Sequence, residues 1–372
     1  MPVHRLRPLL LAAALLLGGC AQSGGTPGYY WQSLRGHLEL LQAARPVQEW
    51  IDRADTPAPL RERLALAQNA RSFAVTELAL PDNASYRRYA RLERSAAVWN
   101  VVAAGPYSLQ LHRWCFPITG CIGYRGYFDE ADARAEAARL AATGLEVNVY
   151  GVPAYSTLGY SNWLGGDPLL STFIAWPEGD FVRLLFHELA HQQVYAVGDT
   201  AFNESYATAV ERLGVRRWLE LHARPAARTQ FEASEQRRAQ FRALTRATRA
   251  RLAEIYASNT AETPDHKAQA AMKTEAMRAF HADYAALRAR WLAAQIAPAQ
   301  LAALDRWVSE ANNASFAAQG AYDDLVPAFV ALFQREGRDW PRFHAAVRAL
   351  AQLPQAEREA ALRALAAPAG GA

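Results

Sequence analysis

The sequence lacks an internal repeat of fixed period, and after its amino terminus it has no apolar run long enough to cross a bilayer. These absences argue against a solenoid and against a protein with several membrane spans. Charge of one sign is also scarce, because 36 acidic residues balance 40 basic ones and the formal net charge is +4. Arginines interleaved with acidic residues along alanine-rich stretches are typical of solvated helices. We therefore expect no nucleic-acid binding.

Cysteine is also rare, with three residues in 372. The first, Cys20, ends the lipobox Leu17-Gly18-Gly19-Cys20, which follows two arginines and the apolar segment 9–17. This pattern predicts a lipoprotein signal peptide at residues 1–19, with bacterial export, cleavage before Cys20 and lipidation of that cysteine. Alanine rather than aspartate comes next, which favours anchoring at the periplasmic face of the outer membrane. The alternative is a conventional secretory peptide with an incidental cysteine.

Lipidation of Cys20 would leave an even pair, Cys115 and Cys121. An oxidising periplasm favours a disulfide across the short loop between them. The alternative is a metal site, for which two lone cysteines are a poor ligand set. We predict a disulfide that staples the fold and takes no part in the chemistry.

The most informative pattern is His187-Glu188-Leu189-Ala190-His191, which lies inside the apolar, helix-forming run 181–197. Two imidazoles four residues apart project from one helix face about one turn apart, so both can bind a single Zn²⁺. Glu188 can then reach a water on that metal and act as its general base. The alternative is that both histidines lie on a core helix, form ordinary hydrogen bonds there and bind no metal.

A catalytic zinc needs a third protein ligand and one open position for water or substrate. Residues 201–213 predict a second helix, with Thr200 as its cap, Gly214 as its stop and Glu204 in its first turn. A tight antiparallel return would bring Glu204 to the two histidines, so we predict it as the third ligand of one Zn²⁺ per chain. Glu211 is the competitor. It could instead accept a ring N–H from a histidine ligand, or be an ordinary surface glutamate.

These blocks, HELAHQ at 187–192 and FNESYA at 202–207, resemble the gluzincin zinc peptidases, in which the glutamate of an Asn-Glu pair on the next helix completes the site. More narrowly, the chain resembles a bacterial family of putative aminopeptidases with a zincin motif. The resemblance implies a zinc metallopeptidase, and an aminopeptidase in particular, that acts on peptides. Further segments that carry it are 114–117, 124–128, 154–159 and 167–172.

Two features depart from that pattern. The spacer between the histidines and Glu204 is shorter than in thermolysin-like enzymes, and Thr208 stands where those enzymes have an aspartate four residues after the glutamate. The Gly-Ala-Met-Glu-Asn type of motif, by which many zinc aminopeptidases bind a free amino terminus, is also missing. The peptidase assignment therefore has more support than the aminopeptidase assignment.

We predict an α+β, predominantly helical fold, with a small mixed sheet and the HExxH helix in a zincin-like lobe. Strands are expected at 108–113, 145–151 and 171–176, and the last would be an edge strand beside the metal helix that pairs with an extended substrate. Helices are expected at 31–54, 59–80, 82–100 and 130–143, and further on at 216–258, 264–293, 298–312, 322–337, 340–353 and 354–365.

The expected domains are a flexible Gly/Ser/Pro tether at 20–30, a zincin-like catalytic region with amino-terminal helices at 31–214, and an all-helical lobe at 215–372. The helical lobe could wall one side of the cleft. It could also bind a partner helix, although a core face is the default explanation for its apolar positions.

In such a site the metal polarises the scissile carbonyl, and Glu188 passes a proton from water to the leaving amine. The oxyanion needs a second donor, for which Tyr155, Tyr160 and Tyr206 are candidates. We prefer Tyr155, which lies in a Gly/Pro-bounded loop, although a core or rim position is the alternative for each tyrosine. The competing function is a non-catalytic, zinc-stabilised envelope lipoprotein that acts as a scaffold for a protein partner.

Some polar residues are candidates for substrate binding. A free amine could be received by Glu178, Asp180 or Asp167, and the substrate backbone by Asn312 or Asn313. Capping or loop roles are the alternatives for all five.

Overall fold

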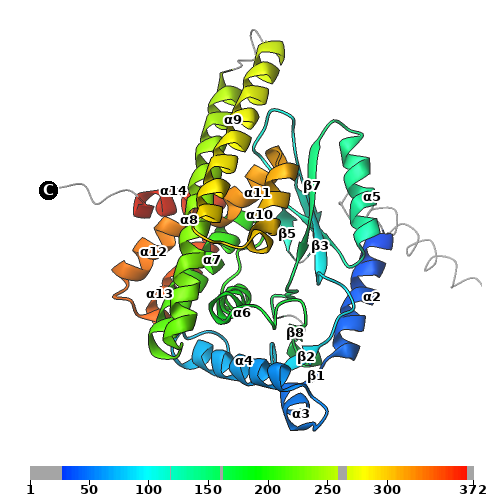
Figure 1. Ribbon diagram of the computed structural model, residues 1–372, viewed down its shortest axis with the longest axis vertical. Coiled ribbons are helices and arrows are strands. Elements are labelled where there is room, and N and C mark those ends of the chain that lie inside the picture. Colours follow the sequence, from blue (N-terminus) through cyan, green and yellow to red (C-terminus); the bar gives the residue numbers. More distant parts are fainter. Residues whose placement is uncertain (1–26, 118, 160–161, 259–265, 367–372) are drawn as a thin grey trace, which may run out of the picture.

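The computed structural model describes residues 27–117, 119–159, 162–258 and 266–366. The fold is α+β and predominantly helical, as predicted, with small sheets enclosed by helices (Figure 1). Cys20, its lipobox and the expected signal peptide lie outside these residues. No helix in the described ranges is long and apolar enough to cross a membrane.

The first described helix, α2 (Pro27–Ala43), begins inside the segment expected to be a tether. Tyr29 explains the earlier start, because its ring packs against Phe116 and Tyr127 at centroid distances of 5.6 and 5.5 Å. The Arg125 guanidinium lies over the same ring at 4.1 Å. This end of α2 is therefore docked on the body of the protein. Two helices follow it, α3 (Val47–Asp52) and α4 (Ala58–Thr76).

The main sheet has the order β6-β3-β7, with both pairs antiparallel. Its central strand, β3 (Val98–Ala104), is buried along its whole length. Helix α5 (Glu130–Ala141) covers one face and α11 (Asn313–Asp323) covers the other. A strand buried on both faces has no polar alternation, and a short apolar run of this kind cannot be told from a helix by periodicity. The helix expected at 82–100 was wrong: the segment consists of turns and the short strand β2 (Arg88–Ala90), and it ends in the first residues of β3.

The expected strand 145–151 is confirmed as β7 (Glu146–Val152), which pairs with β3 while β6 (Arg125–Tyr127) takes the opposite edge. Residues 108–113 form an isolated bridge at Leu111 and no strand. Segment 171–176 was expected as an edge strand, but it is a series of turns in which the Ile174 N–H bonds to the Leu170 carbonyl. Two of its carbonyls already accept hydrogen bonds within the protein: Arg63 donates to those of Ile174 and Trp176 at 2.7 and 2.6 Å.

Two smaller sheets complete the β structure. In the order β1-β2-β8, β1 pairs antiparallel and β8 pairs parallel with the middle strand. The second is an antiparallel hairpin of two strands. Their bounds are Arg45–Pro46 (β1), Arg88–Ala90 (β2), Leu169–Leu170 (β8), Trp114–Phe116 (β4) and Gly120–Ile122 (β5).

Helices α6 (Glu178–Gln193) and α7 (Thr200–Leu221) lie at the centre of the largest core cluster. Gly214 was expected to end the second helix, but α7 continues through it. A Cβ at Gly214 would lie 2.7 Å from a Leu78 methyl and 2.9 Å from the Phe186 ring. This glycine therefore permits close helix packing and does not act as a stop.

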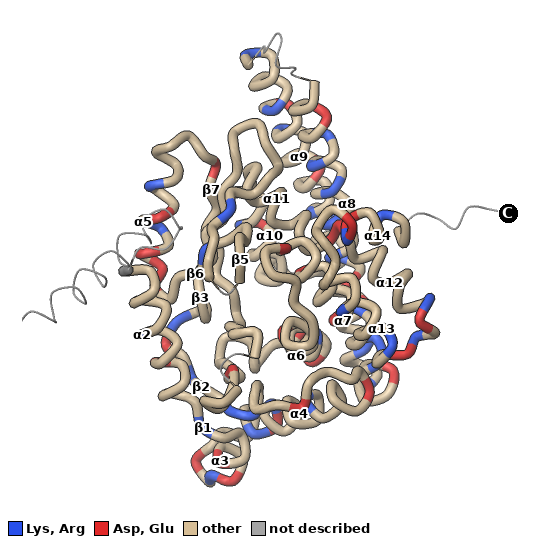
Figure 2. Tube along the Cα trace, turned by 180° about the vertical axis from the view of Figure 1, so that it is seen from behind, with Lys and Arg blue, Asp and Glu red and all other residues tan. Residues whose placement is uncertain are grey.

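The remaining helices pack in two groups. Helices α8 and α9 form a long antiparallel pair with its own core cluster (Figure 1). Helix α10 follows α9 and packs against it. Helices α12 to α14 instead join the core around α7. Residues of both charge signs occur along α8 and α9 (Figure 2). The bounds are Pro225–Ala257 (α8), His266–Ala293 (α9), Pro298–Glu310 (α10), Val326–Arg335 (α12), Trp340–Gln352 (α13) and Gln355–Ala366 (α14).

Candidate metal centre and active site

Helix α6 presents the two histidines from a well-packed scaffold. Phe181, Leu185 and Leu189 are completely buried and fix the rotation of the helix against the core. His187 and His191 are one turn apart, and their ring centroids are 4.8 Å from each other. Both rings are buried. The expected helix 181–197 is therefore present, although it begins earlier and ends at Gln193.

The turn between α6 and α7 returns the chain so that Glu204 faces the histidines. Asp199, rather than the expected Thr200, caps α7 by accepting a hydrogen bond from the Phe202 N–H at 3.0 Å. Asn203 clamps the turn, because its side chain accepts from the Ala196 N–H at 2.7 Å and donates to the Ala196 carbonyl at 2.8 Å. The asparagine of the Asn-Glu pair thus sets the position from which Glu204 projects.

The three candidate ligands form a compact triangle. His187 Nε2 and His191 Nε2 are 3.1 Å apart, and the Glu204 Oε2 atom lies 3.3 and 3.5 Å from them. Ligand atoms placed tetrahedrally at roughly 2.0–2.1 Å from zinc would lie about 3.3 Å from one another. Two imidazole nitrogens and one carboxylate oxygen also match the ligand types of catalytic zinc sites. The residues present therefore fit a metal ion.

Glu211 occupies the other side of His187. Its Oε2 atom lies 2.9 Å from His187 Nδ1, so the carboxylate accepts the ring N–H and leaves Nε2 directed at the triangle. Although burial disfavours the charged form, Arg183 and the His187 hydrogen bond hold the pKa of Glu211 below its usual value. An ionised acceptor of this kind fixes the histidine tautomer and increases the basicity of the ligand nitrogen.

The general-base candidate, Glu188, lines a cavity that also reaches the ligand triangle. Burial raises the pKa of Glu188, and the neighbouring histidines oppose that shift. The cavity has a volume of about 510 Å³, within the usual range for small-molecule and peptide sites. Its walls come from α2, β3, the β4–β5 hairpin, β6, the segment after β7, α6, α7 and α11.

The tyrosines expected near the oxyanion lie in different places. Tyr155 lines the cavity, where its ring packs against Phe128 at 5.0 Å, and burial together with the Asp167 charge raises its pKa. Tyr206 lies in the core, and its hydroxyl is 2.8 Å from His344 Nδ1. Tyr160 lies outside the described residues.

Two other tyrosines, Tyr124 and Tyr322, line the cavity and feel the charge of Glu204, and both were missed in the sequence. The Tyr322 ring is nearly parallel to that of His187, with centroids 6.1 Å apart. Burial raises the pKa values of Tyr322 and Tyr124, and the nearby Glu204 charge raises both further. Both line the cavity. Tyr124 begins the segment 124–128 that carries the family resemblance, but no role was assigned to it, and Tyr322 belongs to none of the segments named for that resemblance.

The acidic residues considered for a substrate amine have other partners. Glu178 accepts from the Trp218 ring N–H at 2.9 Å, and Asp180 pairs with Arg238 at 2.7 Å. Asp167 is fully buried and accepts from the backbone and hydroxyl of Thr157. These three carboxylates do not line the cavity.

The two asparagines have structural contacts. Asn312 caps α11 through a reciprocal capping box with Ser315, so its role is at a helix start rather than at a helix end. The Asn313 side chain donates to the carbonyls of Gly105 and Pro106, both at 2.9 Å. Neither lines the cavity.

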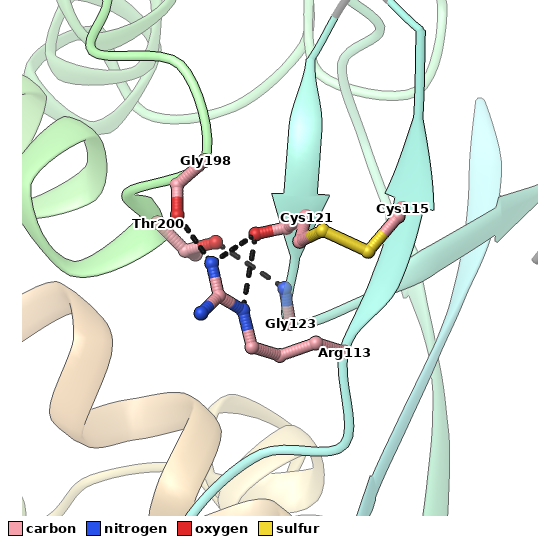
Figure 3. Close-up of a disulfide and its surroundings, with 6 residues drawn as sticks. All are labelled: Arg113, Cys115, Cys121, Gly123, Gly198 and Thr200. Atoms are coloured by element: carbon pink, nitrogen blue, oxygen red, sulfur yellow. Dashed lines mark hydrogen bonds between the residues drawn. A yellow bond between two sulfur atoms is a disulfide. The ribbon is translucent and has the colours of Figure 1, made fainter. Parts of the chain in front are cut away.

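The predicted disulfide is confirmed, and it joins directly opposed residues of the β4–β5 hairpin, Cys115 and Cys121 (Figure 3). Arg113 donates to the carbonyls of Cys121 and Gly198, both at 2.7 Å, and thereby ties the hairpin to the α6–α7 turn. At Gly120, where φ is +72°, a Cβ would lie 2.8 Å from the Gly198 nitrogen. The stapled hairpin therefore contacts the segment that precedes Glu204, and it also supplies Phe116, Thr119 and Ile122 to the cavity.

Comparisons with known proteins give one finding. No curated protein and no solved structure matches the chain. The model of one family, described as "Putative aminopeptidase", matches residues 28–362, which include all the described parts of the cavity and the ligand triangle. The chain therefore belongs to this putative aminopeptidase family, which supports a peptidase at a coarse level.

Proposed function

We propose that the protein is a zinc-dependent peptidase with His187, His191 and Glu204 as the zinc ligands, in a family whose description names aminopeptidases. The observation that carries the proposal is the buried triangle of donor atoms, with edges of 3.1–3.5 Å, at a cavity that Glu188 also lines. A purely structural metal site would not need a carboxylate placed as a base.

A zinc ion bound there would polarise the scissile carbonyl and make water a better nucleophile at neutral pH. Glu188 would accept a proton from the attacking water and deliver it to the leaving amine. Its buried position supports both steps, because a raised pKa makes the protonated form accessible. Glu211 would hold the His187 ring in one tautomer throughout.

The developing oxyanion requires a hydrogen-bond donor from the protein. Tyr155 remains a candidate because it lines the cavity. Tyr322 has the stronger support, since its ring stacks over His187 and the Glu204 and Glu188 charges act on it. Replacing each by phenylalanine separates them: the true donor loses kcat by about 100-fold with KM little changed, and the other variant keeps it.

Metal analysis and peptide hydrolysis together test the proposal. Wild-type protein should hold one zinc per chain and cleave members of a peptide library, while Glu188→Gln should retain zinc and lose about 10²- to 10⁴-fold in kcat. Glu220→Gln, at an exposed position of α7, is the matched control and should change neither. A zinc-loaded wild type that cleaves no peptide would contradict the proposal and favour a non-catalytic envelope lipoprotein.

We also propose that the protein is an exported lipoprotein, anchored through Cys20 at the periplasmic face of the outer membrane. The lipobox and the confirmed pairing of the other two cysteines support this location. Labelled fatty acid should be incorporated into the wild type and not into Cys20→Ser. Equal labelling of both proteins would rule out lipidation at this residue.

A further inference from the structure

We infer that the cavity binds a neutral peptide segment with a bulky apolar side chain next to the scissile bond, and that binding does not require a free amino terminus. The inference rests on the proposed peptidase function and concerns which peptides the site accepts. It follows from the chemistry of the walls and from the roles of the few charged groups at the site.

Four aromatic side chains form what we call the aromatic wall: Tyr29, Phe116, Phe128 and Tyr155. Tyr29 contacts Phe116 at a centroid distance of 5.6 Å, and Phe128 contacts Tyr155 at 5.0 Å. All four line the cavity and are half-buried, so part of each ring surface is available to a ligand. Rings in this arrangement favour contact with apolar and aromatic side chains.

Most of the remaining lining is also apolar or aromatic, and its uncharged polar members are Ser33, Asn100, Thr119 and Ser156. Besides the aromatic wall, the described lining residues that carry hydrocarbon or aromatic side chains are Tyr30, Val98, Pro117, Ile122, Tyr124, Val152, Ala154, Leu158, Tyr195 and Tyr322. A substrate side chain that fills such a space gains by leaving water, whereas a charged one loses hydration without a partner.

The carboxylates and imidazoles of the described lining are those of the proposed chemistry. Among the described lining residues, the carboxylates are Glu188 and Glu204, and the imidazoles are His187 and His191. The proposed function engages three of them with the metal and the fourth with proton transfer. The described lining contains no lysine or arginine for a substrate carboxylate.

The carboxylates of the cavity bear on whether a substrate with a free amine is bound. In an aminopeptidase substrate the free amine belongs to the residue that carries the scissile carbonyl, so it must enter the cavity beside Glu188. The other acidic candidates are held elsewhere, by Trp218, Arg238 and Thr157. A charged amine would thus compete for groups needed in catalysis or lose hydration without compensation. An internal amide has neither effect.

Binding to the zinc-loaded Glu188→Gln protein tests the inference without turnover. The probes are a hexapeptide with phenylalanine as its first two residues, the same peptide acetylated at its amino terminus, and a third with aspartate in place of both phenylalanines. We expect the first two dissociation constants to agree within about threefold and the third to be at least about tenfold larger. Dependence on the free amine, or equal binding of the aspartate peptide, would overturn the inference.

Variants of the wall locate the effect. Phe116→Ala should weaken binding of the phenylalanine peptides about tenfold, with zinc content and the Cys115–Cys121 disulfide unchanged, and Phe116→Leu should restore most of it. The control is Trp163→Ala, which removes an aromatic ring that is 81% exposed and does not line the cavity. Equal effects of the two alanine variants would overturn the assignment of the wall.

Failure of this inference can be distinguished from failure of the proposed peptidase function. Wild-type hydrolysis that depends on Glu188 but stops when the amino terminus is acetylated supports the peptidase and refutes this inference. A zinc-loaded wild type that binds acetylated apolar peptides and cleaves none refutes the peptidase, while the description of the cavity holds.

Discussion

The ligand triangle and the aromatic wall meet in one cavity, but the chain builds them in opposite ways. His187, His191 and Glu204 all come from residues 187–204, on two consecutive helices joined by a turn. The wall is assembled from α2, the β4–β5 hairpin, the end of β6 and the segment after β7. The proposed chemistry is therefore encoded by local spacing, whereas the inferred selectivity depends on packing between distant segments.

Loss of one proposed ligand should produce the largest effect, because it removes metal binding at the triangle and leaves the aromatic wall intact. In His191→Ala, two donor atoms remain, so we expect metal affinity to fall by more than about 100-fold and hydrolysis to disappear. The wall should be retained, which near-ultraviolet circular dichroism would show. The matched control is His222→Ala, an exposed histidine that stacks on Trp218. One tightly bound metal per chain in His191→Ala would refute the ligand assignment.

Removal of Arg358 tests whether the helical pair that carries the ligands depends on distant packing. This residue of α14 donates to the Asp199 cap of α7 at 2.9 Å, and both side chains are buried. Arg358→Ala leaves the buried carboxylate unpaired and should lower the free energy of unfolding by about 3–5 kcal/mol. Urea unfolding measures this loss. Arg363→Ala breaks an exposed pair with Glu359 and should cost less than about 1 kcal/mol. Similar losses in the two variants would contradict the assignment.

Acidification probes the core face of α7, on the side away from the cavity. Burial lowers the pKa of His344 to about 4, and its neutral ring donates to the Leu78 carbonyl and accepts from Tyr206. In the unfolded chain this histidine has a pKa of about 6.5, so between about pH 6.5 and pH 4 the unfolded state binds a proton that the folded state does not. Stability is therefore complete above about pH 6.5 and falls as the pH drops toward 4.

The expected loss from His344 is about 2 kcal/mol between pH 7 and pH 5. Urea unfolding at both pH values should show this difference in the wild type but not in His344→Gln, which keeps a donor and an acceptor. If the variant loses as much stability as the wild type, another group is responsible.

Replacement of Glu211 should weaken metal binding less than His191→Ala does, because Glu211 accepts a hydrogen bond from a proposed ligand and is not itself one. Glu211→Gln weakens the acceptor of the His187 N–H, so metal affinity should fall about 10- to 100-fold in a chelator competition. Glu204→Gln should cost more, because it alters a direct ligand. The reverse order would make Glu211 the third ligand. Glu220→Gln again serves as the exposed control on the same helix.

Local patterns predicted much of the fold. The HExxH helix, the following helix, α5, most of the later helices and the Cys115–Cys121 disulfide follow from spacing, capping and cysteine pairing. Strand β3 was missed because both of its faces are buried, and the turns at 171–176 were missed because their carbonyls are satisfied by a distant arginine. Gly214 was misread because its role lies in helix packing.

The candidate site shows the same division. The sequence placed the ligand triangle, because ligand spacing on a helix is a local property. It did not place Tyr322, which reaches the cavity from α11, or Tyr29, which lay in the expected tether. Such residues carry no local signature, since only the complete fold brings them to the cavity.

The contact between Gly120 and Gly198 joins the two regions mechanically. Because Gly120 and Gly198 have no side chains, the hairpin and the turn approach each other closely, and Arg113 bridges them. Phe116 lies on one side of this junction and Glu204 on the other. Because these contacts tie the disulfide-linked hairpin to the turn, we expect a displacement of Phe116 by a bound peptide to shift also the turn that precedes Glu204, the proposed metal ligand.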